Sequence, residues 1–77
     1  MDKDSYRLQE FGIRLAELRK QNGISQEKLA LESGLARSYL SGVERGQRNI
    51  SLLNIYKIAD TLDIPIERFF DNNLRNK

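Results

Sequence analysis

An all-α domain of five short helices is the fold class that this sequence predicts, and three observations support it. Apolar residues recur at helical spacing along nearly the whole chain. Ser, Gly and Pro stand where such helices would begin and end. Neither an internal repeat nor the alternating pattern of a half-buried strand is present. Because 77 residues leave room for one core, we expect residues 1–77 to form a single domain, with its core over about residues 6–72.

The first predicted helix runs from residue 5 or 6 to residue 21. Gly23 provides its stop signal, because glycine adopts the left-handed conformation without steric cost. Ser25 is then placed to cap a second helix over residues 26–32, which Gly34 ends. The apolar face of the first helix is expected to contain Phe11, Leu15 and Leu18.

A third helix is expected over residues 37–45, with Leu40 and Val43 facing inward and Gly46 as its stop signal. The connection before it, residues 33–35, is short and contains a glycine. Such a connection makes two helices meet at a steep angle, as in a helix-turn-helix. A plain corner between two helices of a bundle is the alternative interpretation of this pattern.

Ser51 is placed to cap a fourth helix over residues 52–62. Pro65 suits the first position of a fifth helix, since its missing N–H is not needed there. We expect this last helix to end near residue 72 and residues 74–77 to form a frayed tail. The apolar face of the fourth helix is expected to contain Leu52, Ile55, Ile58, Ala59 and Leu62.

The outward face of the third helix is polar or basic and lacks an acidic residue. The chain has 13 Lys and Arg against 11 Asp and Glu, a net charge of +2, and the excess falls within residues 37–57, where Glu44 is the one acid. A basic patch on a small domain indicates a polyanion partner; an ordinary solvated face with an uneven count is the alternative. The outward positions are Arg37, Ser38, Ser41, Gly42 and Arg45.

These side chains suit the major groove of DNA, which admits one helix. Arg37 could donate two hydrogen bonds to guanine, whereas Ser38 and Ser41 can contact several bases. Tyr39 could either fill the groove between helices or contact DNA, and we favour DNA. Gly42 is explained equally well by close approach to a ligand and by tight internal packing.

Phosphate contacts are expected on both sides of the third helix. On one side, the start of the second helix presents unpaired N–H groups and a positive dipole end, to which Gln26 adds a side-chain donor. On the other side lie Arg48, Asn49 and the cap residue Ser51. Together these residues would fix the register of the third helix on a duplex.

Residues 8–72 resemble the DNA-binding domains of phage-repressor and Cro relatives, the XRE-type helix-turn-helix family. Within it, the run RSYLSGVERG at residues 37–46, followed by Arg48 and Asn49, is similar to controller proteins of restriction–modification systems. The resemblance implies a compact five-helix lambda-repressor-like domain that acts as a homodimeric transcriptional activator and repressor. A second dimer on an adjacent site and RNA polymerase are further partners that it implies.

The resemblance also implies roles for particular residues. It assigns base contacts to Arg37 and Ser38 and places Tyr39 near a distorted operator centre. It predicts a structural ion pair between Arg19 and Glu44, with a DNA-backbone contact by Arg19 as the lesser alternative. It assigns phosphate contacts to Gln26, Arg48, Asn49 and Ser51. This chain departs from many controllers at Ala36, where they carry an acidic residue, so its operator sequence does not follow from the resemblance.

A homodimer on a palindromic operator is expected, because one helix touches too few base pairs to select a site in a genome. Adjacent helical residues point about 100° apart, so Phe69 and Phe70 should not both enter a core this small. At least one of them should therefore face a second copy; a wide core closed by the last helix is the alternative. The expected interface residues are Leu53, Tyr56, Ile64, Ile66, Phe69 and Phe70.

Composition argues against an enzyme. The chain has no His and no Cys, and it lacks a Gly-rich phosphate-binding fingerprint. We expect no cofactor, metal or small-molecule ligand, no membrane association, and a cytoplasmic location in a bacterium. A phage repressor, an antitoxin or another repressor of the same fold is the nearest alternative. A protein-interaction module is a more distant one, which the acid-free outer face of the third helix disfavours.

Overall fold

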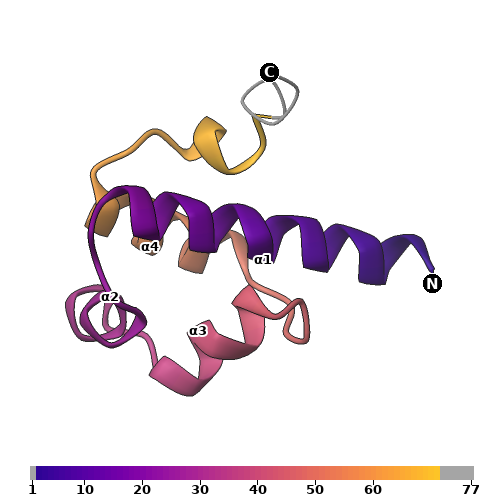
Figure 1. The fold of residues 1–77 in the computed structure, drawn as a ribbon, viewed down its shortest axis with the longest axis horizontal. Coiled ribbons are helices and arrows are strands. Elements are labelled where there is room, and N and C mark those ends of the chain that lie inside the picture. Colours follow the sequence, from indigo (N-terminus) through magenta and orange to yellow (C-terminus); the bar gives the residue numbers. More distant parts are fainter. Residues whose placement is uncertain (1, 72–77) are drawn as a thin grey trace.

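The computed structural model describes residues 2–71, which form four α-helices and a short 3-10 helix joined by loops. In Figure 1, α1 (Lys3–Gln21) crosses the domain, and α2 (Gln26–Ser33) and α3 (Arg37–Glu44) lie on one side of it. In this view α4 (Leu52–Leu62) lies behind α1, and the 3-10 helix η1 (Ile66–Phe69) lies on the side opposite to α3. None of the helices in this described part is long and apolar enough to cross a membrane.

The first helix begins at Lys3, earlier than residue 5 or 6, because Asp2 caps it. The backbone N–H of Ser5 donates to Oδ1 of Asp2 at 2.7 Å. This hydrogen bond lowers the pKa of the Asp2 carboxyl below its ordinary value of 3.8. A carboxylate at this end of a helix also complements the helix dipole. The helix therefore gains two or three residues at its start.

The core takes one face from each α-helix and closes against η1. Leu52, which the helical pattern places on the apolar face of α4, is instead 63% exposed. Ile50, which precedes the helix, is instead partly buried and packs against the buried cluster. The expectation for Leu52 is therefore wrong. The six largest fully buried side chains are Leu15, Leu18, Leu29, Leu40, Val43 and Ile58.

α1 and α3 cross closely at Gly12. A Cβ atom built on Gly12 would overlap the carbonyl oxygens of Val43 and Glu44. Because these are main-chain atoms of α3, a side chain at position 12 would have to push the two helices apart. Gly12 thus sets how near the third helix lies to the first.

Gly12→Ala is expected to lower the free energy of unfolding by about 1–3 kcal/mol, the usual cost of overpacking. The gain of about 1 kcal/mol in helix propensity does not offset a clash with main chain. Urea unfolding followed by circular dichroism measures the difference. Gly42→Ala is the matched control, since its Cβ would meet only the flexible side chain of Arg48. Equal stabilisation by both changes would contradict a tight crossing.

The predicted fifth helix is wrong: the segment after Pro65 forms the single 3-10 turn η1. Nε of Arg14, a buried side chain of α1, donates to the carbonyl of Arg68 at 2.9 Å. The backbone bonds have the i+3 spacing of a 3-10 helix, since the N–H of Arg68 donates to the carbonyl of Pro65 at 3.0 Å and the N–H of Phe70 donates to the carbonyl of Glu67 at 2.9 Å. Residue 72, the predicted helix end, and the predicted tail at 74–77 lie outside the described residues.

Phe69 and Phe70 separate as adjacent aromatic residues should, but with Phe69 inside the domain. The Phe69 side chain is 3% exposed and stacks on Phe11, with ring centroids 5.5 Å apart. Phe70 is 59% exposed and touches Phe11 at a tilted angle, with centroids 5.7 Å apart. Phe69 therefore belongs to the protomer core rather than to a surface for a partner, and Phe70 is the accessible member of the pair.

Candidate nucleic-acid interface

A tight turn joins α2 to α3 and sets the angle between them. Gly34 has φ 78°, in the left-handed region, and its N–H donates to the carbonyl of Ala30 at 3.0 Å. The chain then enters α3, whose Leu40 and Val43 are buried in the core. The opposite side of α3 faces away from the protomer. The pair forms a helix-turn-helix in which α3 is the second helix.

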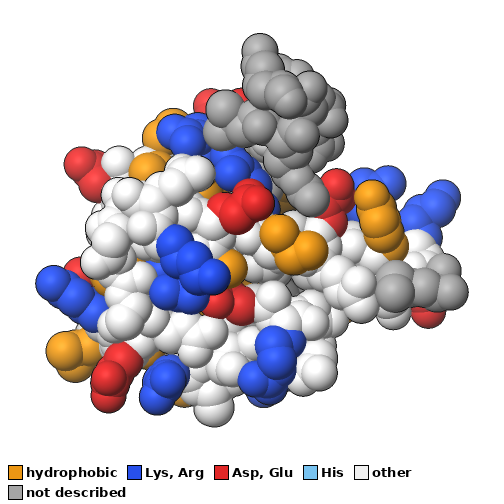
Figure 2. Space-filling model, viewed as in Figure 1, with side chains coloured by type: hydrophobic (Ala, Val, Ile, Leu, Met, Phe, Trp, Pro, Cys, Tyr) orange, Lys and Arg blue, Asp and Glu red, His pale blue; other side chains and the backbone are white. Residues whose placement is uncertain are grey.

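The outward face of α3 carries hydrogen-bond donors. Arg37 and Ser38 are exposed, and neither side chain has a hydrogen-bond partner within residues 2–71. Arg45 lies along the helix, where Nη1 donates to Oγ of Ser41 at 2.6 Å and Nε donates to Oε1 of Gln47 at 3.3 Å. In Figure 2, Lys and Arg side chains lie along the edge of the molecule over α3. The arrangement suits a ligand rich in acceptors and negative charge.

Gly42 is not an outward position, because the side chain of Arg48 covers it. A Cβ on Gly42 would overlap Cγ of Arg48 and would lie 3.5 Å from both Cβ and Cδ of that side chain. Gly42 itself is buried. Of the two explanations for this glycine, the structure shows internal packing.

The turn that ends α3 brings Arg48 back over the helix. Gly46 has φ 76°, and its N–H donates to the carbonyl of Val43 at 3.0 Å. The N–H of Gln47 donates to the carbonyl of Gly42 at 2.8 Å. These two bonds form a Schellman motif, which requires a left-handed residue at the position of Gly46. The reversed chain then places the Arg48 stem against Gly42.

Tyr39 packs between α3 and the segment that follows it. Its ring lies against the core, and the guanidinium carbon of Arg48 is 5.2 Å from the ring centroid. Nδ2 of Asn54, from the first turn of α4, donates to the Tyr39 hydroxyl at 3.1 Å. Asn49 accepts a hydrogen bond at Oδ1 from the N–H of Ile50 at 2.9 Å. The ring of Tyr39 thus fills the space between helices, while a DNA contact by its hydroxyl stays a prediction.

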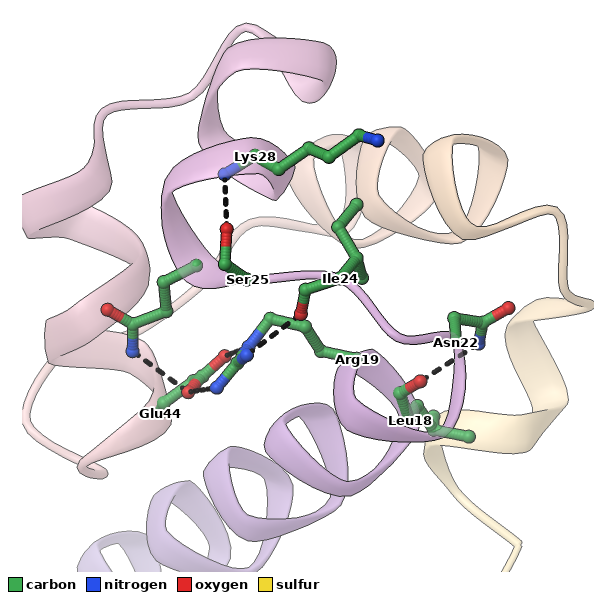
Figure 3. Close-up of polar contacts among 8 residues, drawn as sticks. Leu18, Arg19, Asn22, Ile24, Ser25, Lys28 and Glu44 are labelled. Atoms are coloured by element: carbon green, nitrogen blue, oxygen red, sulfur yellow. Dashed lines mark hydrogen bonds and ion pairs between the residues drawn. The ribbon is translucent and has the colours of Figure 1, made fainter.

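Figure 3 shows a polar network that ties α1, α2 and α3 together. Arg19 donates from Nε to Oε2 of Glu44 at 2.7 Å and from Nη2 to Oε1 at 3.0 Å. Its Nη1 donates to the carbonyl of Ile24 at 2.9 Å. Nε2 of Gln26 donates to the same Oε1 of Glu44 at 2.9 Å. The structure thus brings Arg19 and Glu44 into a bidentate pair and also engages Gln26, leaving its second amide hydrogen for another acceptor.

Serine caps begin α2 and α4, but no side chain caps α3. Oγ of Ser25 accepts from the N–H of Lys28 at 3.0 Å, and Oγ of Ser51 accepts from the N–H of Asn54 at 3.2 Å. Each hydroxyl keeps its own proton to donate. Ala36 makes no side-chain cap bond, so the first N–H groups of α3 lack a side-chain partner at the cap.

Exposed apolar residues lie on α4 and just after η1. Leu53 is 72% exposed and Tyr56 is 45% exposed; one turn of helix separates them, and Leu52 lies beside them. Ile64 and Ile66 are half-buried and pack against the core. We use the name apolar surface for the exposed apolar residues of these two segments taken together, which are Leu52, Leu53, Tyr56 and Phe70.

The sequence patterns do not single out Asn54, although it fixes the hydroxyl of Tyr39. Asn54 is the third residue of the helix that Ser51 caps. A polar residue in the first turn of a helix is common, so the sequence gives no reason to expect a special role for it. The bond from Gln26 to Glu44 is likewise invisible before α2 and α3 are placed together. Both contacts join residues at least 15 positions apart in the chain.

Comparisons with known proteins agree with this geometry. The family model HTH_3, described as helix-turn-helix, matches residues 15–69. The control protein C.BamHI of Bacillus amyloliquefaciens is 44% identical over 62 residues, which cover 79% of this chain and 76% of that protein.

Two solved structures are also similar. The restriction-modification controller protein C.AhdI from Aeromonas hydrophila has a TM-score of 0.82 and 58% identity, covering 84% of this chain and 98% of its own. SinR, a master regulator for biofilm formation solved in complex with DNA, has a TM-score of 0.75 and 35% identity, covering 79% of this chain and 98% of its own. The likeness extends over the part of the chain that contains α2 and α3.

Proposed function

The chain belongs to the HTH_3 helix-turn-helix family and is a DNA-binding transcriptional regulator similar to restriction–modification controller proteins. We propose that it controls a restriction–modification operon and that it acts as a homodimer on a palindromic operator. The observation that carries this proposal is the outward face of α3. Arg37 and Ser38 stand there exposed, on a helix whose other face is held in the core. A regulator of this kind is not an enzyme.

Base contacts are proposed for the start and middle of α3. A helix of this size fits the major groove, about 12 Å wide, and its first residues reach base edges. Arg37 would donate its paired N–H groups to guanine O6 and N7, with Ser38 beside it. Ser41 would donate its proton while its oxygen accepts from Arg45, which lies across the same surface.

Phosphate contacts are proposed on both sides of α3. On one side, Gln26 would donate its second amide hydrogen, beside the N-terminus of α2. On the other side, Ser51 would donate its hydroxyl proton, together with Arg48 and Asn49 from the preceding loop. These contacts would fix the register of α3 without contributing sequence preference.

DNA affinity should fall steeply with salt if these contacts form. The slope of log affinity against log salt concentration counts the phosphates that Lys and Arg neutralise. Arg48 and the exposed Arg37 and Arg45 give about three such charges per protomer, or six per dimer, and predict a slope of roughly −5. Fluorescence anisotropy with a duplex selected from a random pool measures this slope. An unrelated duplex is the control and should show a similar slope at lower affinity. Affinity that does not change with salt would rule out this mode of binding.

We also propose that the apolar surface joins two protomers. Two copies related by a two-fold axis would place their α3 helices about 34 Å apart, matching half-sites one helical turn apart. Leu53, Tyr56 and Phe70 are exposed aromatic or branched side chains, which a partner would remove from water. Ile64 and Ile66 remain candidates at the edge of this contact.

Leu53→Asp and Phe70→Asp are each expected to shift the protein from dimer to monomer and to weaken operator binding. A buried unpaired carboxylate at the contact costs far more than the lost apolar area. Sedimentation at micromolar concentration measures the oligomeric state. Leu31→Asp is the matched control, because Leu31 is 82% exposed on α2 and lies outside the apolar surface. Dimers that persist in both variants would place the interface elsewhere.

The second candidate function is that of a helix-turn-helix regulator that controls other genes, and the similarity to SinR supports it. The two candidates share DNA binding and differ in the genes controlled. Adjacent methyltransferase and endonuclease genes, together with a selected DNA sequence that lies upstream of them, would decide for the controller. RNA polymerase and a second dimer on a neighbouring site are further partners that we propose for the controller function.

A further inference from the structure

We propose that Gly42 and Asn54 are positioning residues that hold Arg48 and Tyr39 as paired donors to one DNA phosphate; this inference rests on the proposed function. The group formed by Gly42, Tyr39 and Asn54 is called the Arg48 platform. It draws on α3 and the first turn of α4, and Arg48 comes from the loop between these two helices. In this proposal Arg48 and Tyr39 contact a phosphate and no base, so they would contribute to affinity for DNA and not to sequence preference.

Gly42 supplies the floor of the platform. The methylene stem of Arg48 occupies the place where any other residue would carry its Cβ. The obstacle for that Cβ is a side chain, not main chain, so a larger residue would displace Arg48 without moving the helix. Gly lowers the stability of an α-helix relative to Ala, so Gly42 makes α3 less stable than Ala would. The glycine is therefore explained by where it puts Arg48.

The ring of Tyr39 contacts the guanidinium group at the end of the Arg48 side chain. The guanidinium carbon lies 5.2 Å from the ring centroid, within range of a cation–π interaction. A cation–π interaction takes up none of the N–H donors of the guanidinium group. Within residues 2–71, no acceptor bonds to the Arg48 side chain, which is exposed. Its donors thus remain available to a ligand beside the Tyr39 ring.

Asn54 directs the hydroxyl proton of Tyr39. The hydroxyl oxygen accepts from Nδ2 of Asn54 at 3.1 Å, so its own proton must find another acceptor. The proton and the guanidinium donors come from side chains that touch each other, which suits the several oxygens of one phosphate. Because both side chains are already ordered, less freedom is lost on binding DNA.

Gly42→Ala separates this positioning role from a structural one. Its thermal midpoint should equal or exceed that of the parent protein, because Ala favours the helix. Its affinity for the selected duplex should nevertheless fall about a hundredfold, the scale of one lost charge-assisted hydrogen bond in each protomer of the dimer. Affinity for an unrelated duplex should fall by a similar factor, as expected for a phosphate contact. Unchanged affinity in Gly42→Ala would overturn the inference.

Double variants show whether each residue acts through its proposed partner. Gly42→Ala should have no further effect on affinity in an Arg48→Ala background, whereas a new methyl group that collides with DNA would still weaken binding there. Asn54→Ala should weaken binding in the parent and have no effect in a Tyr39→Phe background, which lacks the hydroxyl. Independent, additive losses in either cycle would overturn the inference. If the parent protein itself bound no duplex, the proposed function would fail instead.

Discussion

Glu44→Ala is expected to lower the free energy of unfolding by about 3–5 kcal/mol, the usual cost of breaking a buried ion pair. The Arg19 and Glu44 side chains are only 11% and 7% exposed, so the change leaves a guanidinium charge buried beside an empty site. Gln26 loses its acceptor at the same time. Against a total stability of about 5–15 kcal/mol for a domain, this loss is large. Urea unfolding followed by circular dichroism measures it.

Glu32→Ala is the matched control for this experiment. Glu32 pairs with Lys28 at 3.9 Å, but the two side chains are 45% and 62% exposed, and such pairs contribute about 0–1 kcal/mol. Replacing both Arg19 and Glu44 by apolar residues should recover much of the stability, because no charge then remains buried. A loss no larger than that of Glu32→Ala would show that the network does not hold α3 to α1.

Arg37→Ala is expected to weaken binding to the selected duplex by about 1–3 kcal/mol per half-site and to relax discrimination at one base pair in each. The two half-sites of a dimer make the total about 2–6 kcal/mol, since well-separated positions are roughly additive. The structure leaves this arginine exposed and without a partner in the described chain, so stability should not change. Affinities for a panel of duplexes with single base changes measure the loss.

Arg7→Ala provides the control, because Arg7 is exposed near the start of α1 and lies outside the proposed contacts. It removes the same charge, so a general electrostatic effect should appear in both variants. Loss of affinity without any change in base preference would reassign Arg37 to phosphate contact. The comparison with Gly42→Ala then distinguishes the base contact proposed for Arg37 from the phosphate contact proposed for Arg48.

Local signals in the sequence predict most of the helices. Ser25 and Ser51 cap α2 and α4 as expected, and Gly34 and Gly46 end α2 and α3 in the left-handed conformation. Each of these signals acts within one turn of helix, through a single hydrogen bond or a single backbone angle. The four α-helices could therefore be placed before their packing was known.

Long-range contacts decide the features that the patterns miss. Leu52 shares helical spacing with buried residues but is exposed, whereas Ile50, just before α4, packs against the core. After Pro65 the chain forms a short 3-10 turn, and Arg14, 54 residues earlier in the chain, donates to the carbonyl of Arg68 in this turn. Periodicity specifies which residues share a face and does not specify what covers that face.

In the candidate site, too, some features follow from the sequence and others only from the tertiary structure. From the sequence alone, α3 could be identified as the helix whose donors face outward, since its apolar residues repeat on one side and its basic residues on the other. Only the tertiary structure decided that Gly42 lies beneath Arg48 and that Asn54 reaches Tyr39. Those contacts depend on where the loop after α3 returns, and that path is set by packing between elements distant in the chain.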